Sequence, residues 1–125
     1  MNIFFIASGG AIGALSRFGI SSFLKIYLYN SIYATLIINI TGSFFIGYLI
    51  SLGFAKNISE NFIKYFLIIG FLGSFTTFSA FSYEAIELYL SNKIILLIFY
   101  ITLSVVLCVA AAFFGMYINK VWLRI

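Results

Sequence analysis

The chain alternates between four long hydrophobic segments and three short polar separators. The hydrophobic segments cover about residues 3–29, 32–55, 62–90 and 94–123, and the separators cover residues 29–31, 56–61 and 91–93. Each hydrophobic segment exceeds the ~20 residues that a helix needs to cross a bilayer. The pattern therefore predicts four membrane-spanning helices, with both ends of the chain on the same side of the membrane.

The third hydrophobic segment contains a polar stretch near its centre, residues 73–81, with the sequence GSFTTFSAF. A membrane helix gains nothing from an interruption at this depth, because every freed backbone N–H or C=O must find another partner. Such interruptions persist where they line a cavity or hold an ion. We therefore expect a broken third helix, and we place the candidate functional site at the break.

The composition excludes several classes of protein. Hydrophobic residues make up 64% of the chain and charged residues 8%, whereas a soluble domain carries roughly 25% charged residues. We expect an all-α integral membrane protein in which residues 1–125 form one four-helix transmembrane domain. The chain has no histidine and one cysteine, which excludes a histidine-dependent hydrolase and a disulfide framework. We expect no enzymatic activity.

The net charge of +4 comes without a basic run, so it indicates contact with lipid headgroups and no nucleic-acid partner. The charges are spread almost evenly over the two sides of the predicted bundle. The side of the chain ends and middle loop carries Lys56, Lys64, Lys120 and Arg124, and the other side carries Lys25, Lys93 and the deeper Arg17. So weak a bias is compatible with one orientation, amino terminus inside, or with insertion both ways as an inverted pair.

Small residues mark where the predicted helices touch. Gly9 and Gly13 are four residues apart in the first span, and Gly70 and Ser74 repeat this spacing in the third. Such pairs allow two helix backbones to approach closely in a membrane. We interpret all four as packing positions.

Polar residues recur every four positions in two of the spans, so each set shares one helical face. The second span has Thr35, Asn39, Ser43 and Gly47, and the fourth has Tyr100, Ser104 and Cys108. A polar stripe is costly against lipid and therefore faces protein or water. The second-span stripe is either an interhelical hydrogen-bond seam or a pore lining.

The charged and aromatic residues near the break suggest further roles. Arg17 is a charge inside the first span, with either a structural or a vestibule role. Glu84 lies beyond the break, where we expect an interfacial carboxylate paired with a lysine or arginine, or a vestibule role. Phe78 and Phe81 share one helical face and could contact a small anion through their positively polarised ring edges.

Two backbone carbonyls in the break are a further candidate site. The carbonyls of Gly73 and Thr76 lose normal helical bonding and could coordinate a small cation. A simple packing kink relieved by the threonine hydroxyls is the alternative.

Three motifs in order, residues 9–18, 35–44 and 70–84, resemble the Fluc/CrcB family of fluoride channels. The resemblance spans nearly the whole chain. It implies a fluoride-selective channel in the plasma membrane that lets fluoride leave the cytoplasm passively. It also implies an antiparallel dual-topology homodimer with two pores, each built from both subunits.

The family resemblance also implies roles for individual residues. Asn39 would hydrogen-bond fluoride, and Phe78 and Phe81 would be the paired pore phenylalanines. Gly73 and Thr76 would give carbonyl oxygens to a structural sodium ion at the dimer centre. The remaining residues expected along the fluoride pore are Ser43, Ser79, Tyr100 and Ser104.

The chain departs from the family pattern at three positions. Ser74 stands where a second glycine is frequent, Ala80 where a threonine is usual, and Cys108 where a hydroxyl is expected. These departures concern the path of the ion rather than the identity of the protein.

Two other functions remain open from the sequence. A small multidrug-resistance-like, proton-coupled exporter also has four spans, but it needs a carboxylate deep in the first helix, where this chain has none. A non-transporting membrane scaffold subunit would explain the packing glycines, but it would not explain the break beside paired phenylalanines.

Overall fold

The computed structural model describes residues 2–28, 30–53 and 61–122, and these are helical apart from short connections. The elements in chain order are α1 (Asn2–Leu28), α2 (Ser31–Gly53), η1 (Phe62–Leu72), α3 (Gly73–Phe75), α4 (Phe78–Leu90) and α5 (Ile94–Trp122). They form four stretches long and apolar enough to cross a membrane, which confirms the four predicted spans. Three of the positive charges that we compared between the two sides lie outside the described part of the structure: Lys56, Arg124 and the side chain of Lys120.

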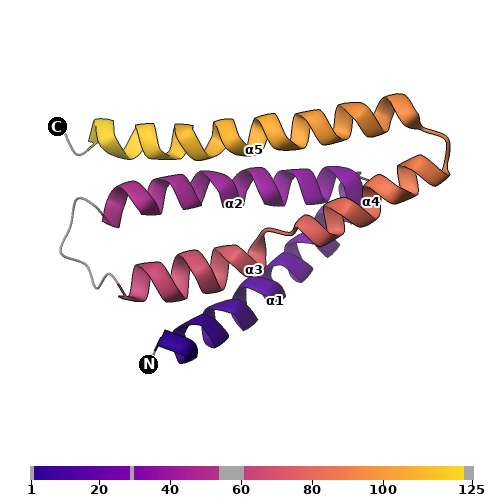
Figure 1. The fold of residues 1–125 in the computed structure, drawn as a ribbon. Coiled ribbons are helices and arrows are strands. Elements are labelled where there is room, and N and C mark those ends of the chain that lie inside the picture. The colour runs from indigo at the N-terminus through magenta and orange to yellow at the C-terminus, as the bar shows by residue number, and fades with distance from the viewer. Residues whose placement is uncertain (1, 29, 54–60, 123–125) are drawn as a thin grey trace.

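The helices form two closely packed pairs (Figure 1). Helices α2 and α5 lie side by side along most of their length, and η1 with α3 packs against α1. Helix α4 leaves the direction of α3 and runs toward the start of α5. The start of α1 and the end of α5 lie at the same end of the bundle, as an even number of spans requires.

Glycines allow both helix pairs to approach backbone to backbone. A Cβ atom added to Gly9 or Gly13 of α1 would collide with the carbonyl oxygen of Phe66 or Phe71, respectively. In the other pair, a Cβ atom on Gly47 of α2 would collide with the carbonyl oxygen of Ala112 on α5. The predicted packing role of Gly9 and Gly13 is confirmed, and Gly47 extends it to the second pair.

Asparagines shape both connections at the other end of the bundle. The Asn30 side-chain oxygen accepts a hydrogen bond from the Ile32 backbone N–H at 3.1 Å, in the manner of a helix N-cap. Asn92 has a φ of 56°, the left-handed conformation in which helices often end. The Lys93 N–H then donates to the Leu88 carbonyl at 2.9 Å, so α4 turns back tightly into α5.

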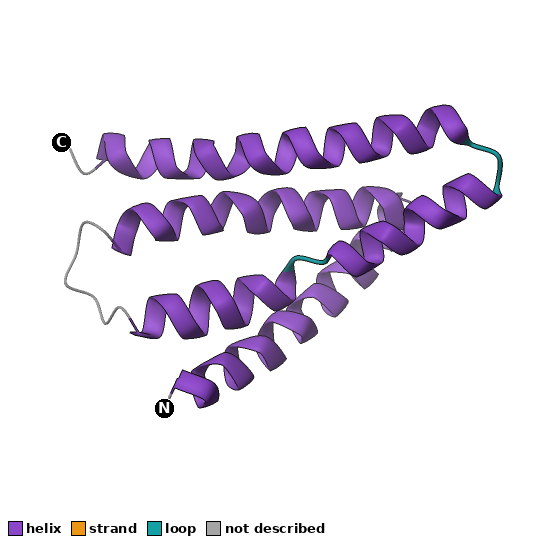
Figure 2. Ribbon diagram, in the orientation of Figure 1, coloured by secondary structure: helices purple, strands orange, loops and turns teal. Residues whose placement is uncertain are grey.

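The third span is interrupted at two threonines (Figure 2). Helix α3 ends at Phe75 and α4 begins at Phe78; Thr76 has a ψ of 152°, and Thr77 has φ −145° and ψ 117°. Our expectation of an interruption across residues 73–81 was too broad. Gly73 keeps helical dihedrals, φ −63° and ψ −30°, whereas the two adjacent β-branched threonines favour extended backbone.

The close approach of α1 to the third span predicts opposite effects for two glycine substitutions. Gly13→Ala should lower stability by roughly 1–3 kcal/mol, because the new methyl group presses on the Phe71 backbone. Gly19→Ala is the matched control, since a Cβ atom there meets nothing within 4 Å, and it should be neutral or stabilising. Thermal unfolding in detergent, followed by circular dichroism, measures both. Equal midpoints for the two variants would contradict this packing.

Candidate functional site

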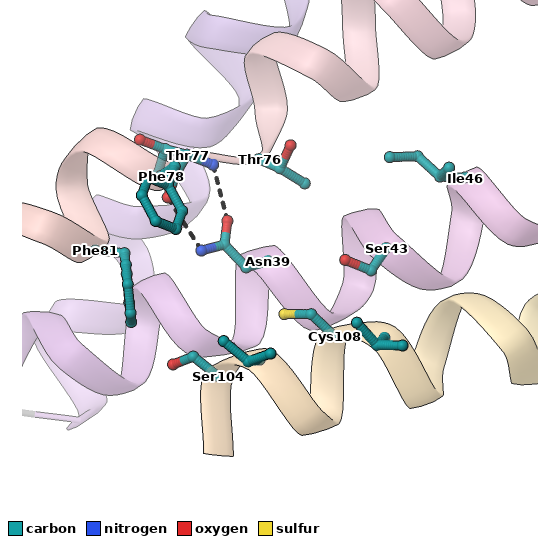
Figure 3. A pocket seen from close by; sticks show the side chains of 11 residues that line it. Asn39, Ser43, Ile46, Thr76, Thr77, Phe78, Phe81, Ser104 and Cys108 are labelled. Carbon is teal, nitrogen blue, oxygen red and sulfur yellow. Dashed lines mark hydrogen bonds between the residues drawn. The ribbon is translucent and has the colours of Figure 1, made fainter. Parts of the chain in front are cut away.

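The Asn39 side chain holds the extended backbone of the third span (Figure 3). Its Nδ2 donates to the Thr77 carbonyl at 3.1 Å, and its Oδ1 accepts from the Thr77 N–H at 2.8 Å. Gly42, one turn further along α2, lets the break come close, because a Cβ atom there would collide with Thr76 Cγ2. The amide of Asn39 therefore supplies an acceptor for the Thr77 N–H, whose partner in a continuous helix would have been the Gly73 carbonyl, and it adds a donor to the Thr77 carbonyl.

The two threonines of the break also satisfy backbone groups on either side of it. Thr76 Oγ1 donates to the Leu72 carbonyl at 2.8 Å, and the Ala80 N–H donates to Thr77 Oγ1 at 3.2 Å. Thr77 is thus the N-cap of α4. Both bonds agree with the alternative in which threonine hydroxyls relieve the kink. The N-cap role of Thr77 was not predicted, although a threonine directly before a helical pattern is a recognised start signal.

These hydrogen bonds leave two carbonyls without their helical donors. In an α-helix the N–H of residue i+4 donates to the carbonyl of residue i. The N–H that would serve Gly73 belongs to Thr77 and goes to Asn39, and the N–H that would serve Thr76 belongs to Ala80 and goes to the Thr77 hydroxyl. Gly73 and Thr76 are the two residues expected to offer carbonyl oxygens to a cation.

A cavity of about 320 Å³ opens between α2, α5 and the break, and we name it the aromatic cavity (Figure 3). Its lining consists of Asn39, Ser43, Ile46, Thr76, Thr77, Phe78, Phe81, Ser104, Val105, Cys108 and Val109. It brings together five of the seven residues predicted for a fluoride pore: Asn39, Ser43, Phe78, Phe81 and Ser104. No residue of this described lining is charged. The aromatic cavity is therefore a neutral space with several polar groups.

The paired phenylalanines form one end of the aromatic cavity. The ring centroids of Phe78 and Phe81 are 5.2 Å apart, and Phe81 contacts the Tyr100 ring at 5.1 Å. Phe81 is buried, whereas Phe78 is 76% exposed on this single chain. The outer ring is therefore positioned to contact whatever covers this face of the bundle.

Helix α5 contributes the polar wall of the aromatic cavity. Ser104 is only 7% exposed, yet its Oγ has no hydrogen-bond partner among the residues that the structure describes. Cys108 follows one turn later on the same face, opposite Ser43 of α2 (Figure 3). A buried hydroxyl without a partner is uncommon in proteins, so Ser104 is a candidate ligand group.

Two residues expected in the pore lie outside the aromatic cavity. Ser79 is exposed, and its hydroxyl lies 3.1 Å from Thr77 Oγ1. It follows Phe78 by one residue, which turns its side chain about 100° around the helix. Tyr100 is 3% exposed and lies behind Phe81. Neither residue lines the cavity within one chain, so their place in a pore built from two subunits stays a prediction.

Glu84 is buried, and its partners differ from those expected. Its carboxylate accepts from the Thr35 hydroxyl at 2.8 Å and from the Tyr100 hydroxyl at 2.6 Å. Only 4% of Glu84 is exposed, so the expectation of an interfacial carboxylate paired with a lysine or arginine was wrong. A buried carboxylate requires hydrogen-bond donors, and α2 and α5 each supply one.

A second cavity, of about 310 Å³, lies between α1, α2 and α4, and we name it the charged cavity. Its lining includes Arg17, Lys25, Glu84 and Thr77, the last of which also lines the aromatic cavity. Arg17 Nε donates to the Ser74 carbonyl at 3.1 Å. Arg17 therefore both binds a carbonyl next to the break and faces a polar cavity. The break separates two cavities of different character.

Comparison with known proteins decides the family. A family model described as "CrcB-like protein, Camphor Resistance (CrcB)" matches residues 4–116 of the chain. The chain belongs to the CrcB-like family. Its four apolar spans are those of a multi-pass membrane protein.

CrcB-like relatives match this chain over almost its whole length. The chain is 40% identical to a protein of Flavobacterium psychrophilum over 119 residues, which is 94% of this chain and 96% of the relative. It is 38% identical to a protein of Agrobacterium fabrum over 122 residues, covering 96% and 97% of the two chains. A protein of Dehalococcoides mccartyi is 37% identical, with 94% and 92% covered. Each relative is named "Fluoride-specific ion channel FluC".

The buried hydrogen bonds of Glu84 predict a loss of stability when a donor is removed. Tyr100→Phe should lower stability by roughly 0.5–2 kcal/mol, because hydrogen bonds between membrane helices contribute about this much. Tyr117→Phe is the matched control on the same helix, since Tyr117 is 64% exposed. Unfolding in detergent compares the two variants with the unaltered protein. If Tyr100→Phe loses no more stability than Tyr117→Phe, the hydrogen bond to Glu84 does not hold α4 against α5.

Proposed function

We propose that this chain is the subunit of a fluoride-selective channel in the plasma membrane, through which fluoride leaves the cytoplasm passively. The observation that carries the proposal is the aromatic cavity, where hydrogen-bond donors and two phenylalanine rings meet in a lining without charged residues. Family membership and the names of the relatives support the choice of fluoride.

The donors of the aromatic cavity suit a small, strongly hydrated anion. The Asn39 amide nitrogen carries two N–H groups; one of them donates to Thr77, and the other could donate to an ion. The Ser104 hydroxyl, without a protein partner among the described residues, supplies a second donor. The edges of Phe78 and Phe81 add positive potential without a fixed charge. Such a site replaces water without trapping the ion.

The charged cavity supplies an approach to this site. Arg17 and Lys25 give it two positive charges against the single negative charge of Glu84, and Glu84 is already bound by two hydroxyls. A cavity with excess positive charge concentrates anions. Thr77 lines both cavities, so we place the transfer of fluoride between them at the interrupted backbone.

A second, inverted copy of the chain would complete the pore. Phe78 is 76% exposed and Ser79 is exposed beside it, so both side chains are available to a partner subunit. The weak charge asymmetry between the two sides permits insertion in both orientations. The pore residues of the pair would be Asn39, Ser43, Phe78, Ser79, Phe81, Tyr100 and Ser104, with Tyr100 acting through its contact with Phe81.

If the two subunits are inverted, a tag added to the C-terminus should be accessible from both faces of the membrane. In cells, a membrane-impermeant reagent should label roughly half of the tags before lysis, because two opposite orientations occur in equal number. A tag confined to one face would contradict the antiparallel arrangement and leave a parallel assembly.

The carbonyls of Gly73 and Thr76 fit a structural sodium ion between the subunits. Their helical donors are engaged by Asn39 and by Thr77, so both oxygens are available as the neutral ligands that an alkali cation accepts. When bound, sodium would supply a positive charge that neutralises the dipoles of these carbonyls. The backbone of this chain would provide the site, and the Asn39 amide would keep it open.

Fluoride release from liposomes tests the function. Vesicles loaded with potassium fluoride and reconstituted with the protein should empty rapidly when a potassium ionophore is added, as read by a fluoride electrode. Vesicles loaded with chloride should release it no faster than protein-free vesicles. If vesicles that contain folded protein release no fluoride, the proposal is wrong. If they release chloride as fast as fluoride, the channel is not selective for fluoride. Release that a proton gradient accelerates would favour the proton-coupled exporter. Release of neither fluoride nor chloride would favour the non-transporting scaffold.

Variants of the paired phenylalanines provide the control within the same assay. Phe81→Ile should slow fluoride release at least about tenfold, since losing about 1.4 kcal/mol at the barrier has this effect. Phe113→Ile should leave the rate unchanged, because Phe113 is 63% exposed on α5 and outside the cavity lining.

The same assay in buffers without sodium tests the cation site. Fluoride release should slow, and an undiminished rate of fluoride release would contradict the site.

A further inference from the structure

The aromatic cavity contains a thiol that fluoride conduction does not require. Cys108 is the single cysteine of the chain, and it is half-buried in the lining of the cavity. Its side chain points into the cavity between Asn39 and Ser43 (Figure 3). A reagent that reacts with thiols therefore has one possible covalent target in each subunit.

A second observation indicates that this part of the cavity can hold a ligand. Ser104, one helical turn before Cys108, is 7% exposed, and its Oγ has no partner among the described residues. Ser43 faces the same space from α2. The three side chains thus offer one sulfur and two hydroxyl oxygens from two facing helices.

The chemistry of these donors selects the kind of ligand. Hard divalent ions such as magnesium and calcium need several carboxylate or carbonyl oxygens, and the described lining has no carboxylate. Thiolate sulfur binds soft metal ions. The donor set therefore favours a soft cation held by one strong sulfur bond.

We propose that Cys108 makes the aromatic cavity a binding site for soft, thiol-seeking metal cations of the class of mercury(II) and silver(I), and that the bound metal blocks the passage of fluoride. With methylmercury chloride, the Cys108 S–H bond and the Hg–Cl bond break and an S–Hg bond forms. The proton and the chloride ion leave to water, and no atom is oxidised or reduced. The blocking part rests on the proposed function, and the binding part does not.

The block follows from the position of the sulfur. A metal on Cys108 would stand in the cavity that Asn39 and Ser104, the two donors assigned to the ion, also line. It would fill the space through which fluoride passes. The inhibition should be reversed by an excess of a small thiol, because thiol ligands exchange on such metals.

Methylmercury chloride tests both parts on the reconstituted protein. Mass spectrometry of the intact protein should show one methylmercury group per chain, and fluoride release should fall to the rate of protein-free vesicles. Cys108→Ser should gain no mass and should keep its own untreated rate after exposure. Each rate is divided by that of the same untreated variant, so any change in basal rate does not enter.

A relocated thiol separates a blocked pore from general damage. The double variant Cys108→Ser, Val106→Cys carries its thiol two residues away on α5, where Val106 is 56% exposed and outside the cavity lining. It should gain the methylmercury group, and its rate of fluoride release should equal that of the same variant before treatment. An adduct on Cys108 without loss of flux would overturn the block. Failure of the folded protein to form the adduct, when the unfolded protein forms it, would overturn the site. Both results differ from failure of the function, in which untreated vesicles release no fluoride.

Discussion

The structure depends on the paired hydrogen bonds between the Asn39 amide and the backbone of Thr77. A membrane-spanning helix can be interrupted only if its freed backbone groups find other partners. Asn39 accepts from the N–H and donates to the carbonyl of the same residue, at 2.8 and 3.1 Å, and thereby satisfies both groups at once. The glycine at position 42 lets α2 come near enough for this contact. Without the amide, the Thr77 N–H would lose the acceptor that the structure gives it inside the membrane.

The features of the candidate site follow from this one contact. Because the Thr77 N–H is directed to Asn39, the carbonyl of Gly73 loses its helical donor. The change of direction at Thr76 and Thr77 carries α4 away from α3 toward α5 (Figures 1 and 2), which places Phe81 against Tyr100. It also leaves space on both sides of Thr77, where the aromatic and the charged cavities lie. The interruption thus creates both the candidate cation site and the candidate anion site.

The sequence predicted those features that depend on spacing along one helix. Apolar length predicted the four spans, and a four-residue period predicted that the face carrying Thr35 and Asn39 meets protein. The same period led correctly to the packing glycines of α1. The features it did not predict depend on contacts between distant segments. The partners of Glu84 lie 49 and 16 residues away, so neither its burial nor its two hydroxyl donors could be inferred from its neighbours. Likewise, Gly73 suits either a helix or a break, and the hydrogen bonds around it decide that it stays helical.

The most direct test of this account is amide hydrogen exchange at Thr77, followed by nuclear magnetic resonance in detergent micelles or by mass spectrometry of short peptides. In the unaltered protein this amide should exchange slowly, and in Asn39→Ala it should exchange at least about tenfold faster, because its acceptor is gone. Thr41→Val is the control on the same helix, since the Thr41 hydroxyl bonds only to its own helix, at the Ile37 carbonyl, and it should leave the rate unchanged. Equal exchange of the Thr77 amide in the unaltered protein and in Asn39→Ala would contradict the central role of this pair.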